Sequence, residues 1–146
     1  MDQAAGNAMN RTTMNIFVVE GAPEIRRRLV AMVRRVSGIN VIGEGSTVNE
    51  AKDAVQRGEA EALLLGLQPM GGADLEALTR LKQARPELRT IVLANSASPQ
   101  YMQASLAAGA EICLDKTREF GLVPDILRNW VEAAGLNNTD KEKSNG

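Results

Sequence analysis

Apolar residues follow two different rhythms along the chain. Five short runs are mostly apolar and rich in Val, Ile and Leu, which is typical of buried strands. Between them, apolar positions recur every three or four residues, the period of an amphipathic helix. The predicted strands occupy residues 15–19, 39–45, 61–66, 89–94 and 111–115. Strict alternation of strand and helix predicts an α/β fold in which a parallel sheet carries helices on both faces.

Proline, glycine and a capping motif delimit the predicted helices. Pro23 is expected at the first position of the first helix, and Pro124 opens the last one. Residues 47–50 (Thr-Val-Asn-Glu) have the form of a capping box that starts the second helix. Glycine is expected just after the end of three helices, at Gly58, Gly109 and Gly135. The predicted helices occupy residues 23–36, 47–57, 73–84, 99–108 and 124–134, with Ser98-Pro99 capping the fourth.

The two ends of the chain differ from the patterned middle. Residues 1–13 and 136–146 are polar, small and without apolar periodicity, so both are predicted to be disordered. Residues 14–135 form one predicted domain, since a chain of 146 residues is long enough for a single core. No signal peptide is apparent, and no apolar run approaches the roughly 20 residues of a membrane span. These features predict a cytoplasmic protein that does not bind membranes.

Composition narrows the functional classes further. The formal net charge is −1 and aromatic residues make up 3% of the chain, which disfavours nucleic acid as a partner. The sequence has no histidine, which excludes Ser–His or Cys–His catalysis, histidine-based metal sites and a phosphohistidine. The single cysteine, Cys113, lies in an apolar run and is expected to be a buried structural thiol. We therefore expect no enzyme activity of these kinds and no cofactor.

The carboxyl ends of the strands are where a doubly wound sheet usually carries its functional crevice. Glu20 and Lys116 are the only charged side chains expected directly at the central strand ends, and they could pair across the crevice. A single carboxylate holds Mg²⁺ poorly, so no metal site is predicted. The segment "GGADLE" (residues 71–76) lacks the Lys-Ser/Thr of a P-loop, and no GxGxxG motif follows the first strand.

Three segments carry a resemblance to a known family. They are "NIFVVEGAPEIRRRLVAMV" (15–33), "AEALLLGLQPMGGADLEALTRLK" (60–82) and "TIVLANSASPQYMQASLAAGAEICLDKTREF" (90–120). Together they resemble the response-regulator receiver domains, the CheY-like branch of the flavodoxin-like fold, over about Asn15 to Ala134. The resemblance implies a (βα)5 three-layer sandwich whose five parallel strands have the order 2-1-3-4-5.

The family's functional residues are only partly present. Receiver domains hold an acidic pair after the first strand, and these positions correspond to Glu20 and Gly21, so one carboxylate is kept. The phosphoacceptor Asp that ends the third strand corresponds to Gly66, and the Thr or Ser that ends the fourth corresponds to Ala94. The family's lysine is kept as Lys116. The resemblance thus implies a degenerate phosphoacceptor pocket, because Gly66 offers no nucleophilic oxygen and two metal ligands are missing.

These departures favour a stand-alone, atypical receiver, a pseudo-receiver that acts in two-component signalling through protein–protein contacts and without phosphorylation. The resemblance places the docking face at Tyr101, Gln103, Ile112 and Trp130. Ile112 stands where the family has an aromatic switch residue and has no hydroxyl to act as one. Core packing is the plainer interpretation for Tyr101 and Trp130. A homodimer through this face or the first helix is also compatible with the resemblance, and no DNA-binding helix-turn-helix is expected in the short remainder.

Two other functions stay open at this point. Lys116 and nearby helix N-termini could hold a phosphate-like anion in the vacated crevice, unless Leu67, Met70 or a water fills it. A phosphoryl group could instead be received by Glu20, although the Mg²⁺ needed for that transfer lacks ligands. The basic run of residues 26–28, with residues 34 and 35, could meet an acidic partner or form the solvated face of the first helix.

Overall fold

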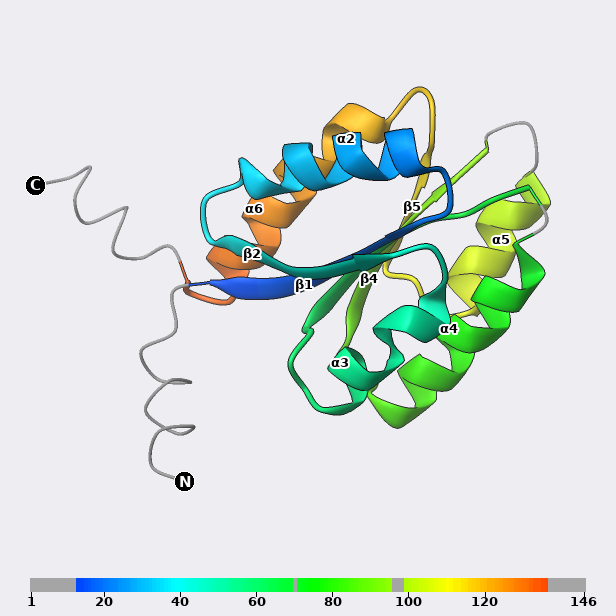
Figure 1. Cartoon of the computed structure of the whole chain (residues 1–146), viewed down its shortest axis with the longest axis horizontal. Coiled ribbons are helices and arrows are strands. Elements are labelled where there is room, and N and C mark those ends of the chain that lie inside the picture. Colours follow the sequence, from blue (N-terminus) through cyan, green and yellow to red (C-terminus); the bar gives the residue numbers. More distant parts are fainter. Residues whose placement is uncertain (1–12, 70, 96–98, 137–146) are drawn as a thin grey trace, which may run out of the picture.

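Five parallel strands form the centre of the molecule (Figure 1). The computed structural model describes residues 13–69, 71–95 and 99–136, and the strands are adjacent in the order β2-β1-β3-β4-β5. Their bounds are β1 (Met14–Glu20), β2 (Ile39–Gly45), β3 (Ala62–Gly66), β4 (Arg89–Ala94) and β5 (Ile112–Asp115). The predicted flavodoxin-like fold and its strand order are confirmed, and each strand lies within one residue of its predicted bounds.

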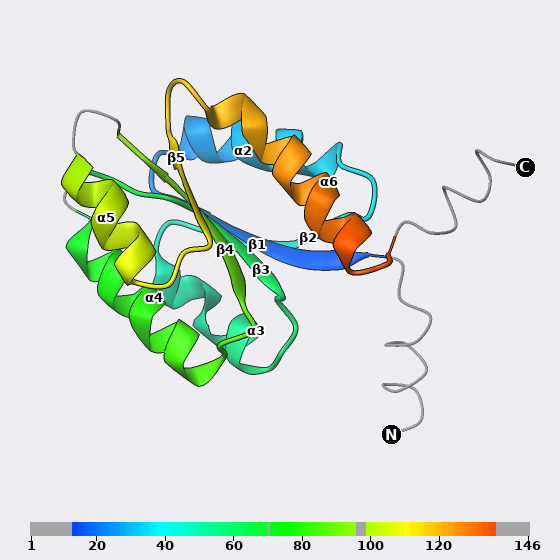
Figure 2. The same ribbon diagram turned by 180° about the vertical axis from the view of Figure 1, so that it is seen from behind.

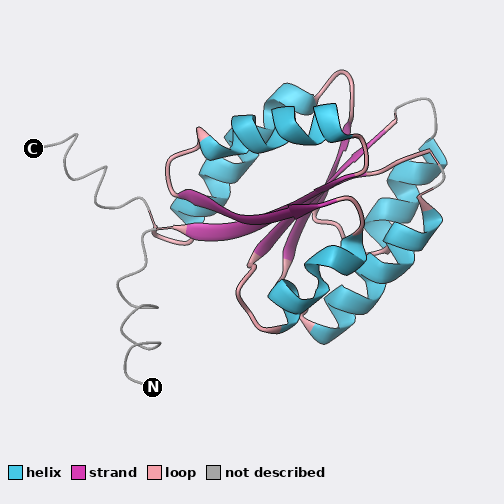
Figure 3. Cartoon of the chain, viewed as in Figure 1, coloured by secondary structure: helices cyan, strands magenta, loops and turns pink. Residues whose placement is uncertain are grey.

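Helices cover both faces of the sheet and complete a three-layer sandwich (Figures 1 and 3). One face carries α2 (Pro23–Arg34) and α6 (Val123–Ala133), and the other carries α3 (Lys52–Gln56), α4 (Gly72–Ala84) and α5 (Pro99–Ala107). Two short 3₁₀ segments, η1 (Val48–Ala51) and η2 (Phe120–Leu122), precede α3 and α6. Within the described ranges, none of these helices is long and apolar enough to cross a membrane.

Each face of the sheet buries its own apolar cluster. Along β1, Ile16 and Val18 belong to the cluster that includes α2 and α6, while Phe17 and Val19 belong to the cluster that includes α3 and α4. The central strand β3 is buried at every position, which explains why its sequence is an unbroken apolar run rather than an alternating one. Because the strands are anchored by packing on both faces, the residues at their carboxyl ends are held in place along one edge of the sheet.

The start of the second helical segment differs from the predicted capping box. The Thr47 hydroxyl donates to Glu50 Oε2 (3.4 Å), which also accepts the Ser46 N–H (3.2 Å), and the Thr47 side chain caps no backbone N–H. Asp74 at the start of α4 accepts the Val48 N–H instead (3.0 Å). With this cap supplied by another helix, the segment begins as the 3₁₀ turn η1, and only residues 52–56 are α-helical.

Glycines end the helices as predicted, but the folded domain extends one residue further than expected. Gly58, Gly109 and Gly135 all have positive φ. After α6, the Leu136 N–H donates to Val131 O (3.0 Å) as part of a Schellman motif around Gly135. This motif returns Leu136 to the core, where it is 8% exposed. The prediction of disorder from residue 136 is therefore wrong at Leu136, while residues 1–12, 98 and 137–146 lie outside the described ranges.

Candidate functional site

The carboxyl edge of the sheet brings the predicted crevice residues together. Glu20 ends β1 directly opposite Gly66, the last residue of β3. Ala94 ends β4, and its carbonyl accepts the Lys116 N–H (2.8 Å). Gly21 follows Glu20 at the same edge. Residues that are far apart in the sequence therefore meet where a doubly wound sheet usually carries its site.

Glu20 forms the centre of this site because its side chain is completely buried. Glu20 Oε1 lies 2.9 Å from Lys116 Nζ, which is the ion pair expected across the crevice. Glu20 Oε2 accepts the Ala22 N–H (2.9 Å) and a hydrogen bond from Gln68 Nε2 (2.5 Å). Lys116 Nζ also lies 3.4 Å from Leu67 O. The buried carboxylate is tolerated because a cation and two donors compensate its loss of water.

Gly66 is required by the position of the Glu20 carboxylate. A Cβ atom built on Gly66 would lie 1.9 Å from Glu20 Oε1, far inside van der Waals contact. The Glu20 side chain thus occupies the volume in which a side chain at position 66 would stand. The two residues are complementary in size, since a long side chain at one position fills the space that glycine leaves at the other.

Gln68 is a site residue that no motif or strand position in the sequence identifies. Its side chain lies beside Gly21, where an added Cβ would be 3.3 Å from Gln68 Cγ, and its amide reaches Glu20. Leu67, one predicted filler of the crevice, is buried with the apolar cluster that includes α3 and α4. Met70, the other, lies outside the described residues. Among the described residues, Glu20 and Gln68 are the polar side chains that lie in the crevice.

Arg26 ties the start of α2 to the ends of β1 and β2. Its guanidinium donates to Glu20 O (2.8 Å) and to Ser46 Oγ (3.1 Å), and it pairs with Glu44 (3.3 Å). The Arg26 side chain is 21% exposed, so the prediction of a solvated arginine run does not hold for this residue. Arg27 and Arg28 are exposed, as that prediction expects.

The Mg²⁺ ion that a receiver-type pocket implies does not fit the residues of this site. Both carboxylate oxygens of Glu20 are already held, one by Lys116 and the other by Gln68 and a backbone N–H. Gly21 and Gly66 carry no ligand atoms in their side chains. Over the described part of the chain, no group of three or more Cys, Asp or Glu residues could hold a metal ion.

Comparison with known proteins establishes the family. The family model described as "Response regulator receiver domain" matches residues 16–128, which is most of the chain. The chain belongs to the response-regulator receiver domains. Receiver domains are signalling domains of two-component systems.

Two curated relatives are similar in sequence to this receiver domain. The transcriptional regulatory protein DesR of Bacillus subtilis is 26% identical over 98 residues, which cover 67% of this chain and 48% of DesR. The DNA-binding transcriptional activator DevR/DosR of Mycobacterium tuberculosis is 27% identical over 97 residues, which cover 66% of this chain and 45% of that protein. The chain thus spans just under half the length of these relatives.

Solved receiver structures share the fold. The response regulator domain of Thermotoga maritima CheB superposes with a TM-score of 0.67 at 18% identity, covering 86% of this chain and 97% of that one. A LuxR-family response regulator from Aurantimonas sp. SI85-9A1 gives a TM-score of 0.70 at 18% identity, with 83% and 86% covered. At these identities the likeness supports the fold alone.

The residues predicted for a docking face are not gathered on one surface of the receiver domain. Gln103 is exposed on α5, and Tyr101 is half-buried with its hydroxyl donating to Pro69 O. Ile112 packs against the cluster that includes α2 and α6. Trp130 belongs to that cluster and is 8% exposed. Trp130 is therefore a core residue, as the plainer of its two interpretations expects, and its burial gives no support to a place on the docking face.

Leu106 is an exposed residue of α5 that the sequence analysis missed. Its side chain is 52% exposed, and it lies one turn after Gln103 on the same helix. The neighbouring strand β5 forms one edge of the sheet, between α5 and α6 (Figure 2). Leu106 was hard to identify because α5 is rich in small residues and its apolar positions do not define a single buried face. Of the predicted face, Gln103 is therefore exposed and Tyr101 half-buried, and Leu106 adds an exposed apolar side chain beside Gln103 on α5.

Cys113 on β5 is half-buried rather than fully buried. Burial raises the pKa of the Cys113 thiol, a hydrogen bond with Ser105 lowers it, and the nearby Glu119 carboxylate raises it. The net effect is a pKa above the ordinary value for a thiol. A raised pKa agrees with the prediction that this cysteine is structural, because the reactive form of cysteine is the thiolate.

Proposed function

We propose that this receiver domain is a pseudo-receiver, which signals without phosphorylation through contact with another signalling protein. The observation that carries the proposal is the relation between Glu20 and Gly66. The carboxylate of Glu20 lies where the side chain of residue 66 would be. Aspartyl phosphorylation needs a carboxylate oxygen at the end of β3, and Gly66 has none.

Neighbouring positions support the loss of phosphoryl chemistry. Gly21 supplies no second carboxylate for a metal ion, and Ala94 supplies no hydroxyl for a phosphoryl group. Phosphoryl transfer depends on metal ions and positioned donors that neutralise the developing charge. Lys116, the remaining donor, is already paired with Glu20.

The contacts of Glu20 weigh against the two alternatives at the crevice. A phosphate-like anion at Lys116 would compete with the Glu20 carboxylate, which lies 2.9 Å from the ammonium group. Phosphorylation of Glu20 itself would break its contacts with Lys116 and Gln68 in a fully buried position. We therefore place neither an anion-binding site nor a phosphoryl acceptor in this crevice.

A protein is the kind of partner that we propose. Solved neighbours include a CheX–CheY complex from Borrelia burgdorferi and RcsB of Salmonella enterica bound to promoter DNA. The DNA binding named for RcsB and for DevR/DosR belongs to proteins of which this chain matches only a part. A net charge of −1 gives this chain no overall attraction for nucleic acid. A cytoplasmic location is part of the same proposal.

The loss of phosphoryl chemistry is tested with beryllofluoride and Mg²⁺, a mimic of the phosphoryl group, in a titration followed by the amide resonances of the isotope-labelled domain. We expect the resonances of Glu20, Gly66 and Lys116 to stay in place, and the intact mass to stay unchanged after incubation with acetyl phosphate. Saturable shifts at these residues would overturn the proposal. So would an added phosphoryl mass that disappears in Glu20→Gln.

The interaction role is tested with two matched surface variants. Leu106→Arg places a charge on the exposed part of α5, and Leu122→Arg does the same on η2, where Leu122 is 45% exposed. Tagged wild-type and variant proteins are used to capture partners from the native cell, with quantification by mass spectrometry. We expect a partner retained by wild type and Leu122→Arg to be lost with Leu106→Arg. Equal capture by all three proteins would contradict a docking role for α5.

A further inference from the structure

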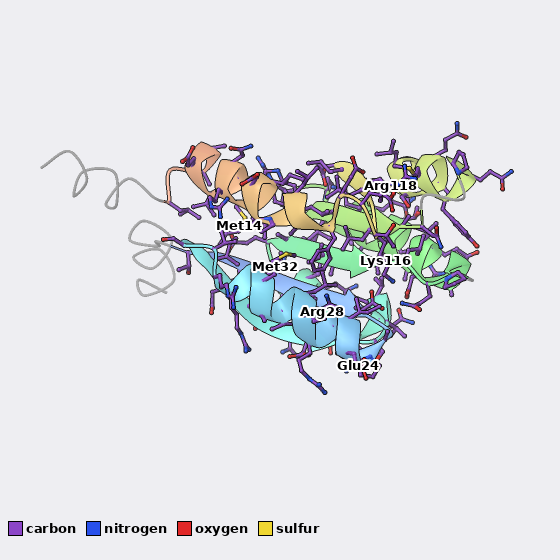
Figure 4. The ribbon with its side chains drawn as sticks, turned by 90° about the horizontal axis from the view of Figure 1, so that it is seen from above. Met14, Glu24, Arg28, Met32, Lys116 and Arg118 are labelled. Carbon is purple, nitrogen blue, oxygen red and sulfur yellow. The ribbon has the colours of Figure 1, made fainter. Side chains whose placement is uncertain are left out.

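A cleft lies between α2 and the segment that follows β5, on the side of the sheet shown in Figure 4. Its volume is about 350 Å³, at the lower end of the range for small-molecule sites. It is lined by Ile25, Arg28, Lys116, Thr117 and Phe120. Figure 4 labels Arg28 on α2 and Lys116 in the segment after β5.

The lining combines an apolar wall with two cations. Ile25 and Phe120 are half-buried and pack against the core beneath α2 and α6, so the wall they form is anchored. Among the described lining residues there is no acidic side chain. Lys116 is balanced by Glu20, whereas Arg28 has no ion-pair or hydrogen-bond partner in the part of the chain that the structure describes. Arg28 therefore supplies the uncompensated positive charge of the cleft.

Two other grooves lack the aromatic part of this wall. The groove on the far side of α2 includes Arg26, which is already paired with Glu44 in the same groove. The cleft at the amino ends of the strands includes Arg85, which donates to Gln56 O (2.7 Å) and pairs with Glu87. The groove on the far side of α2 also contains Arg27 and Arg34, so it keeps positive charge, but neither groove places an aromatic side chain beside its cations.

We infer that the α2–β5 cleft binds a small organic anion, a carboxylate carried on an aromatic body. The carboxylate pairs with the Arg28 guanidinium, which can donate two parallel hydrogen bonds. The aromatic body packs on Ile25 and Phe120, where burial of apolar surface favours binding. Lys116 stays paired with Glu20, so Arg28 is the cation that the ligand pairs with. This inference does not depend on whether the domain is phosphorylated or on its protein partner.

The inference is tested with 1-naphthoate as the probe, in a titration followed by the amide resonances of the whole chain. Two analogues separate the contributions: acetate has the charge without the ring, and 1-naphthamide has the ring without the charge. We expect saturable shifts at Ile25, Arg28, Thr117 and Phe120 with naphthoate and weaker binding of both analogues. Equal affinity for naphthoate and naphthamide would overturn the inference, as would shifts confined to other surfaces.

Two neighbouring arginines provide a matched pair of variants. Arg28 lines the cleft. Arg27 precedes it in the sequence, is also exposed on α2, and lines the groove on the far side of that helix. We expect Arg28→Gln to raise the dissociation constant of naphthoate about tenfold, since a charged hydrogen bond carries at least that much affinity. Arg27→Gln should leave the constant unchanged. Equal effects of the two substitutions would indicate general electrostatic attraction and contradict a site in this cleft.

Discussion

At the scale of single residues, Glu20 and Gly66 determine what the crevice can hold. The Glu20 side chain is long enough to cross the end of β3 and reach Lys116, and it can do so only because residue 66 has no Cβ. Burying a carboxylate costs several kcal/mol unless partners replace its water. Here Lys116, Gln68 and the Ala22 N–H replace it. The pocket is thus closed by the protein's own side chains.

Gly66→Ala tests this size relation directly. The added methyl group would lie 1.9 Å from Glu20 Oε1, so the carboxylate must move away from its partners. We expect the free energy of unfolding to fall by about 2 kcal/mol or more, as for overpacking combined with a disturbed buried ion pair. Urea denaturation followed by circular dichroism measures the change.

Gly72→Ala is the matched control, because no atom lies within 4 Å of the Cβ that it would add. This substitution should change the free energy of unfolding by less than about 0.5 kcal/mol. If both variants lose the same amount, the clash with Glu20 is not the cause. The loss from Gly66→Ala should also shrink in a Glu20→Ala background, since the clashing carboxylate is then absent.

Cys113 provides a prediction about pH. Because burial raises the pKa of its thiol, less thiolate is present at a given pH than in a free cysteine. We expect the rate of alkylation by iodoacetamide at pH 7.5 to be lower than that of glutathione, and its rise with pH to occur at higher pH. Mass spectrometry over a pH series gives the rates. A rate equal to or above that of glutathione at pH 7.5 would show that the thiol is activated.

Part of the site could be predicted from the sequence, and the rest depends on geometry. Glu20 and Lys116 could be paired in advance because parallel strands bring their carboxyl ends to one edge of the sheet. The contact of Gln68 with Glu20 could not be predicted, because the direction of a loop side chain depends on the path of the backbone after the strand. The burial of Trp130 agrees with the core interpretation of its helical position, whereas its family position alone would have placed it on the docking face.

At the scale of elements, the strands were predictable and the ends of some helices were not. Continuous apolar runs specify β3 and β4 because these strands are buried on both faces. A local capping motif predicts a helix start wrongly where a residue of another element caps it instead. Here Asp74 of α4 accepts the Val48 N–H of η1, and the Thr47 side chain caps no backbone N–H. The turn η2 has no distinct sequence signal, and α2 ends two residues before the predicted position.

Substitution of Leu136 tests whether the folded domain extends past the end of α6. Leu136 follows the Schellman motif at the end of α6 and is packed in the core, so Leu136→Ala should remove buried apolar contacts. We expect the free energy of unfolding to fall by about 2 kcal/mol. Leu122→Ala, at an exposed leucine, should cost less than about 0.5 kcal/mol. Chemical denaturation of both variants makes the comparison, and equal losses would contradict a structural role for residue 136.

At the scale of the whole molecule, the site lies at the carboxyl edge of the sheet and takes its side chains from several elements. Glu20 comes from β1, Gly66 from β3 and Lys116 from the segment after β5, so a single substitution alters contacts among several elements. The loop after β3 extends these contacts: the Gln68 side chain reaches Glu20, and Pro69 O accepts the Tyr101 hydroxyl of α5. Under the proposed function, phosphoryl transfer could therefore be introduced only by coordinated changes at several of these positions.

Gly66→Asp alone should not make the domain accept a phosphoryl group. The new side chain would meet the Glu20 carboxylate in the same volume, and Mg²⁺ would still lack a free ligand from β1. The triple variant Glu20→Asp, Gly21→Asp, Gly66→Asp shortens the first side chain and adds two carboxylates, while Lys116 is kept. We expect only the triple variant to gain the mass of one phosphoryl group with acetyl phosphate and Mg²⁺.

The double variant Glu20→Asp, Gly21→Asp is the control for this experiment, since it has the acidic pair without an acceptor and should gain no mass. If Gly66→Asp alone gained this mass, the Glu20 side chain would have moved aside to admit the new carboxylate. The size relation between residues 20 and 66 would then not be what prevents phosphorylation. Mass gained only by the triple variant would show that the acceptor and the residues of β1 act together. In that case the receiver scaffold still supports the reaction, and the side chains at its carboxyl edge alone prevent it.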